Sequence, residues 1–132
     1  MYVRFTARSA DRNVVTRLNV APGFFGVAHD LWYDRHCDDP VLLAIRQELD
    51  WFNDWLPAPR RLTVKARGRH WPDGICWFRD DARDMLVHAN ALAGLIADCG
   101  VAVERCWTRD PGQILYRDPW QVVAKPERYH VS

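Results

Sequence analysis

Apolar and polar side chains alternate near the start of the chain and recur at helical spacing farther on. Residues 2–7 alternate, which predicts a strand. A second, weaker alternation at 14–20 is consistent with another strand. After Pro22-Gly23, apolar residues return at steps of three and four, and this spacing predicts a helix over 24–33.

Two longer helices are predicted from apolar stripes that are bounded by capping and breaking residues. The first has Asp39 as its expected cap and Pro40 at its first helical position, and it ends at a pair of prolines. The second covers 80–98, with Asp80 or Asp81 as its cap. The predicted buried stripes are Leu42, Ile45, Leu49, Phe52 and Leu56 in the first helix, and Met85, Ala89, Leu92, Leu95 and Ile96 in the second.

The remaining alternations predict strands around 61–67, 101–107, 114–116 and 120–124, with a polar tail over 125–132. The element order is then β-α-α-β-α-β-β-β. A strand, helix and strand over 61–107 form a crossover that places two strands parallel, and the later turns add antiparallel partners. We therefore expect a two-layer α+β domain, 1–132, in which a mixed β-sheet carries helices on one face.

Composition narrows the class of protein. A chain of 132 residues has the length of one domain, and 48% hydrophobic residues exclude disorder. The net charge of +1 gives no global field toward nucleic acid, which we regard as a disfavoured partner. Neither a signal peptide nor a membrane-spanning run is evident, and four cysteines in such a chain are expected to be reduced. Although two bridges in three pairings are also conceivable, we expect a cytoplasmic protein.

The chemistry-bearing residues form no strong motif. The spacing of Cys and His does not match a structural zinc site, so we expect neither metal nor cofactor. Cys37, beside His36, is expected to be an inert thiol rather than a nucleophile. His88 is expected at the edge of the core with one hydrogen bond. The carboxylates Glu48, Asp50 and Asp54 are expected on the solvated side of their helix.

A basic segment follows the first long helix, and no acidic residue occurs between Asp54 and Asp73. Basic side chains beside aromatic ones suit the capture of an anionic ligand or an acidic protein. The alternative is a solvated edge strand that positive charge protects from edge-to-edge pairing. The candidate ligand-binding residues are Arg61, Lys65, Arg67, Arg69, His70 and Trp71.

Two function classes therefore stay open. The first is a binding or interaction module that uses this basic–aromatic patch, with self-association as a further expectation. The second is a small enzyme whose site at the end of the sheet is lined by His70, Asp73, Cys76 and Arg109. Of the 7 Trp, most are expected in the core, including Trp77, Trp107 and Trp120, and Trp71 is expected to be partly exposed.

Several segments resemble a group of small uncharacterised bacterial proteins. The resemblance implies a bacterial, cytosolic, one-domain protein and transfers no catalytic residue. The segments that carry it are 22–28 (PGFFGVA), 49–57 (LDWFNDWLP), 75–78 (ICWF), 108–118 (TRDPGQILYRD) and 121–124 (QVVA).

Overall fold

Three helices and five strands make up the part of the chain that the computed structural model describes, residues 1–7, 23–35, 37–56 and 74–125. The elements are, in chain order, β1 (Tyr2–Ala7), α1 (Phe24–Asp34), α2 (Asp39–Trp55), β2 (Ile75–Arg79), α4 (Arg83–Asp98), β3 (Val103–Thr108), β4 (Gln113–Arg117) and β5 (Gln121–Lys125). This order is the predicted one, and the predicted α+β class is confirmed.

The five strands form one sheet in the order β3-β1-β2-β5-β4, and every hydrogen-bonded neighbour is antiparallel. The crossover through α4 gives β2 and β3 the same direction, but it begins at β2 (Ile75–Arg79), which was not predicted as a strand, and the strand predicted at 61–67 lies outside the described residues. However, β1 lies between them and runs the opposite way, which makes a split β-α-β arrangement. The sheet is therefore antiparallel at every ladder, and the expectation of a mixed sheet is wrong on this point, although the α+β class holds.

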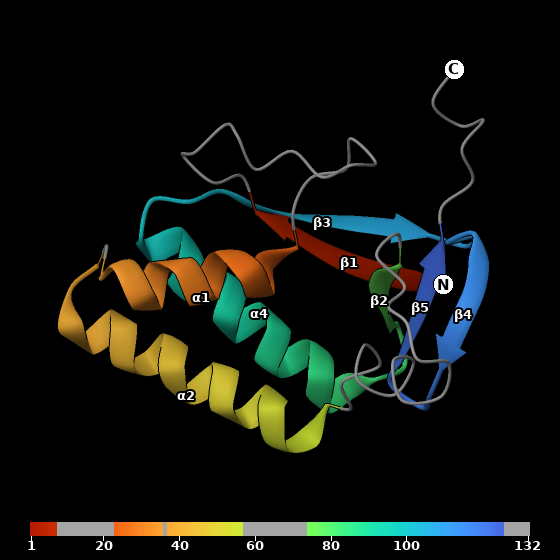
Figure 1. Cartoon of the computed structure of the whole chain (residues 1–132), viewed down its shortest axis with the longest axis horizontal. Helices are drawn as coiled ribbons and strands as arrows, with labels where there is room; N and C mark the ends of the chain where they lie inside the picture. Colours follow the sequence, from red (N-terminus) through yellow and green to blue (C-terminus); the bar gives the residue numbers. More distant parts are fainter. Residues whose placement is uncertain (8–22, 36, 57–73, 126–132) are drawn as a thin grey trace, which may run out of the picture.

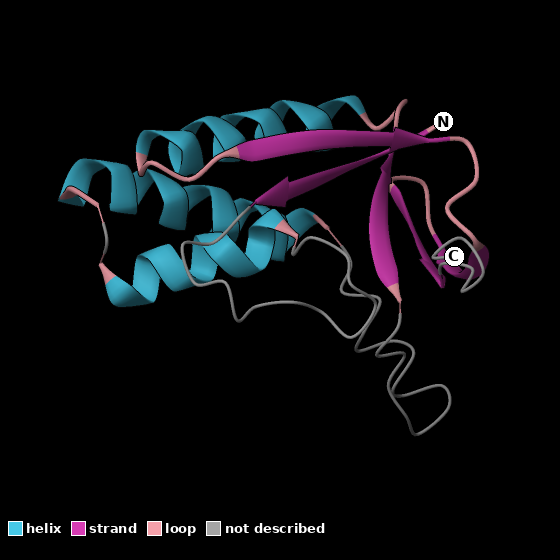
Figure 2. Ribbon diagram, turned by 90° about the horizontal axis from the view of Figure 1, so that it is seen from above, coloured by secondary structure: helices cyan, strands magenta, loops and turns pink. Residues whose placement is uncertain are grey.

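The helices lie together against one face of the sheet, over β1 and β3, while β5 and β4 extend beyond them (Figure 1; Figure 2). Aromatic rings join the two layers. Phe5 of β1 stacks on Phe24 of α1 with ring centroids 4.9 Å apart, and Phe78 of β2 meets both Phe25 and Phe52. These rings fill the space between strands and helices, where large aromatics bury the most apolar area per residue.

Each long helix buries four of the five residues in its predicted stripe, and the fifth, Leu56 or Leu95, is half-buried. Leu42, Ile45, Leu49 and Phe52 are buried in α2, and Met85, Ala89, Leu92 and Ile96 are buried in α4. The caps differ from the prediction. Asp38 and not Asp39 precedes α2, and α4 begins at Arg83 after Ala82, because the chain first turns through Asp80 and Asp81.

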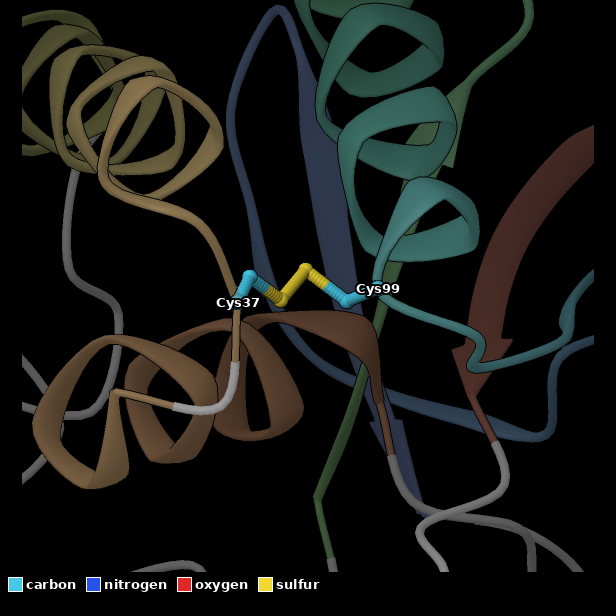
Figure 3. The surroundings of a disulfide bond; sticks show 2 residues. All are labelled: Cys37 and Cys99. Carbon is cyan, nitrogen blue, oxygen red and sulfur yellow. A yellow bond between two sulfur atoms is a disulfide. The ribbon is translucent and has the colours of Figure 1, made fainter.

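A disulfide joins Cys37, just before α2, to Cys99, at the end of α4 (Figure 3). The two Cα atoms are 5.6 Å apart, which is a usual separation for a bridge. The expectation of reduced thiols is therefore wrong for these two cysteines. Cys76 and Cys106 are free.

Several tryptophans are less buried than the sequence predicted. Trp107 is 55% exposed and Trp120 is 36% exposed, so the expected core role is wrong for both. Trp107 lies on the edge strand β3, opposite Val3 of β1, and Trp120 lies in the turn before β5. Trp55, at the last turn of α2, is also exposed.

Three predicted segments lie outside the described residues: the strands over 14–20 and 61–67 and most of the tail over 125–132. Within the described ranges, no helix has both the length and the apolar character needed to cross a membrane.

Candidate functional site

The predicted basic–aromatic patch lies outside the described residues. This applies to Arg61, Lys65, Arg67, Arg69, His70 and Trp71, and also to Asp73 of the alternative enzyme site. The two remaining members of that alternative, Cys76 and Arg109, are described. Tyr2 of β1 pairs with Arg79 on one side and with Thr108 on the other, so these two residues lie at the same level of the sheet. Cys76 lies three residues before Arg79, and Arg109 lies one residue after Thr108. Cys76 and Arg109 are therefore four residues, or roughly 13 Å, apart along the strand direction, with β1 between their strands. The fold does not bring these two side chains together.

A cavity of about 230 Å³ opens at the end of the sheet where β1 begins and where β2 and β4 end. We call it the arginine cavity. Its lining residues are Met1, Tyr2, Arg79, Asp80, Arg117 and Val122. Drug-sized ligands usually occupy pockets of about 300–1,000 Å³, so this cavity suits a smaller molecule.

The strand order explains how two arginines distant in sequence meet there. Arg79 is the last residue of β2 and Arg117 is the last residue of β4. Strand β5 lies between these strands, with Val122 opposite Arg117 and the backbone carbonyl of Trp120 accepting from the amide of Arg79 at 2.8 Å. Both guanidinium groups therefore border the beginning of β5.

The two guanidinium groups are not equivalent. Arg79 donates from Nε and Nη2 to the two carboxylate oxygens of Asp81, at 3.1 and 2.9 Å, which fixes its plane and neutralises its charge. Asp80 pairs with the ammonium group of Met1 at 3.8 Å. In the described part of the chain, no carboxylate pairs with Arg117. Arg117 is thus the exposed cation that a ligand in the cavity meets.

A hydrogen-bonded turn fixes the strand end that carries Arg117. The carboxylate of Asp118 accepts from the backbone amides of Trp120 and Gln121 at 2.8 and 2.9 Å, and from the side chains of Tyr116 and Gln121 at 2.9 and 3.0 Å. Desolvation, together with the hydrogen bond to Asp118, raises the pKa of Tyr116 to about 12. A register shift between Ile114 and Tyr116 changes which residues of β4 pair with which residues of β5.

A second polar cluster joins the two long helices. His88 Nδ1 and Glu48 Oε2 are 2.7 Å apart, and the His88 ring stacks on Trp51 with centroids 3.6 Å apart. His88 is half-buried with this hydrogen bond, as predicted. Glu48 was expected in solvent but is also half-buried, because the flanks of both stripes meet where α2 packs on α4. The pair joins helix α2 to helix α4, and neither residue lines the arginine cavity.

The described residues contain no group of three or more His, Cys, Asp or Glu side chains that is arranged to hold a metal ion. The arginine cavity itself was missed by sequence reasoning. A signal was present, since Arg79 and Arg117 each end a strand directly before an aspartate, but only the strand order brings them to one edge. Comparison with protein-family models, with curated proteins and with solved structures finds no match to this chain.

Proposed function

We propose that this protein is a binding module that captures a small anionic ligand in the arginine cavity. The observation that supports this most is the pairing of a fixed guanidinium, Arg79, with an open one, Arg117, around a single cavity. A guanidinium presents planar donors that match the two oxygens of a carboxylate or phosphate. The exposed lining of the cavity is mainly polar, which suits a small, charged anion.

Binding of inorganic phosphate and of acetate tests the proposal. Isothermal titration is carried out on the wild-type chain and on Arg117→Gln, with Arg83→Gln as the matched control. Arg83 is an exposed arginine at the start of α4, so its replacement changes the net charge equally without touching the cavity. A hydrogen bond to a charged group contributes about 1.5–3 kcal/mol, so Arg117→Gln should weaken binding about ten- to a hundredfold.

The control should bind as tightly as the wild type. If neither anion binds the wild-type chain, or if Arg117→Gln binds as well as Arg83→Gln does, the arginine cavity is not an anion site. If the wild-type chain does bind these anions, the ratio of its affinities for phosphate and acetate indicates whether the natural ligand is a phosphate ester or a carboxylate.

The basic–aromatic patch belongs to the same proposal as a second contact for an anionic ligand or an acidic protein partner. The double variant Arg67→Glu/Arg69→Glu should lose capture of such a partner in a pull-down, while phosphate binding at Arg117 stays unchanged. Unchanged capture would remove the patch from the proposal. Self-association is a further proposal, which sedimentation of the purified chain tests.

The predicted cytoplasmic location is also a proposal, and the Cys37–Cys99 bond makes it testable. Disulfides are rare in the cytosol except where they are transient. Rapid alkylation of thiols in intact cells, followed by intact-mass analysis, measures the bridged fraction. A fully bridged population would contradict a cytoplasmic location.

A further inference from the structure

The lining of the arginine cavity contains one carboxylate, that of Asp80, which a simple anion would not use. Asp80 directly follows Arg79, at the point where β2 ends and the chain turns before α4. Its backbone amide donates to the carbonyl of Met1 at 3.2 Å, which holds the residue beside the start of β1. Its side chain is 51% exposed, so the carboxylate is accessible to a ligand.

Most of the acceptor capacity of this carboxylate is unused. Within the described ranges its ionic partner is the ammonium group of Met1, at 3.8 Å. A charge-assisted N–H···O bond is about 2.7–2.9 Å long, so this contact is an ion pair without a hydrogen bond. Asp81 differs, because both of its oxygens accept from Arg79. Exposed ion pairs stabilise a protein only weakly, so Asp80 can accept a second ammonium group at small cost.

Asp80 and Arg117 border the same cavity without neutralising each other. Arg117 lies opposite Val122 and Val122 lies opposite Trp77, so Arg117 and Trp77 share one level of the sheet, roughly 10 Å apart. Asp80 follows Trp77 by three residues, which is at most about 10 Å farther along the chain. The Cα atoms of Asp80 and Arg117 are therefore about 10–14 Å apart, which leaves space for one small molecule between the two charged groups.

We propose that the ligand of the arginine cavity is a small aminocarboxylate, a molecule with one carboxylate and one ammonium group. This inference rests on the proposed function: the carboxylate binds Arg117, and the ammonium group binds Asp80. The planar donors of a guanidinium match two carboxylate oxygens, and the three donors of an ammonium group match the open oxygens of Asp80. A cavity of about 230 Å³ suits a free amino acid better than a peptide. The Asp80 carboxylate also disfavours a phosphate ester, which carries up to two negative charges.

Matched pairs of ligands test the proposal. Each pair is an aminocarboxylate and the plain carboxylate in which a methyl group replaces the ammonium group: glycine with propionate, β-alanine with butyrate, and γ-aminobutyrate with pentanoate. Isothermal titration of the full chain at neutral pH measures each affinity. In at least one pair the aminocarboxylate should bind about three- to fivefold tighter than the plain carboxylate, since an exposed ion pair contributes up to about this factor.

Two variants assign this preference to Asp80. Asp80→Asn keeps the size of the side chain and removes its charge. The preference should fall to about one, because the aminocarboxylate loses its partner while the plain carboxylate loses a repelling charge. Asp84→Asn is the matched control, since Asp84 is exposed on the first turn of α4 and does not line the cavity. It should keep the wild-type preference. Arg117→Gln should weaken both members of each pair.

Equal affinities within every pair would overturn the inference, and so would a preference that survives Asp80→Asn. In both cases, binding of plain carboxylates that Arg117→Gln weakens would still support the proposed function. If no member of any pair binds, the inference fails as well, and the titration with phosphate alone decides whether the cavity is an anion site.

Discussion

Reduction of the Cys37–Cys99 bond should lower the free energy of unfolding substantially. The bridge closes a loop with a sequence separation of 62 residues. In the chain-entropy model, a loop of this length removes about 4 kcal/mol of conformational freedom from the unfolded chain at 25 °C. With an unfolding entropy of about 2.1 cal/mol/K per residue over 132 residues, this loss corresponds to a decrease of roughly 15 °C in Tm.

Urea unfolding followed by circular dichroism, with and without a thiol reductant, measures this effect. The reductant should lower the midpoint and should also increase the m-value, because an unbridged chain exposes more surface when it unfolds. Two variants separate the bridge from other thiol effects. Cys76→Ser/Cys106→Ser retains the bridge and should respond to reductant like the wild type, whereas Cys37→Ser/Cys99→Ser should not respond at all.

Intact-mass analysis before each titration establishes that the bridge is present, since the bridged form is lighter by two hydrogen atoms. If the bridged wild type and Cys37→Ser/Cys99→Ser unfold at the same urea concentration with the same m-value, the entropic reasoning is refuted. A lower midpoint with an unchanged m-value would instead locate the effect in the folded state, where the bridge ties α2 to α4.

Four single substitutions test other parts of the fold. Gly100 has φ +85° after α4, so Gly100→Ala should cost about 1–2 kcal/mol in urea unfolding, whereas Gly94→Ala, within the helix and with open space around it, should stabilise by about 0.5–1 kcal/mol. Tyr116 should titrate near pH 12 by ultraviolet absorbance and move toward its ordinary value of 10.0 in Asp118→Asn. Because its folded-state pKa is raised, its contribution to stability is present below about pH 10 and is lost as the pH rises toward 12. Phe52→Ala should cost about 3–5 kcal/mol, since this buried ring contacts neighbours from α1, α2 and β2; a loss below about 1 kcal/mol would contradict the described core.

The helices were predictable because their signals are local. Apolar residues at steps of three and four fix which face of α2 or α4 is buried, whatever the other elements do. Their starts were displaced by one to three residues, because Asp38 and not Asp39 precedes α2 and because the chain turns through Asp80 and Asp81 before α4 begins. The α+β class followed from the order of the elements, since strands and helices that bury one face each must pack as layers.

The arginine cavity and the disulfide depend on strand order and helix packing instead. Arg79 and Arg117 meet only because β5 lies between β2 and β4. Cys37 and Cys99 meet only because the beginning of α2 lies beside the end of α4. Neither arrangement can be read from the composition of the chain. The expectation of reduced thiols followed from how cysteines are usually found in domains of this size, and not from the packing of α2 on α4.

The two faces of strand β1 differ in the polarity of the side chains that they bury. The helix-facing side of β1 buries only Val3, Phe5 and Ala7, as a structural face should. On its opposite side the same strand buries Arg4 and Thr6, and its first residue lines the arginine cavity. The helices and the Cys37–Cys99 bond stabilise one face of the sheet, and the end of the sheet carries the two arginines of the proposed binding site.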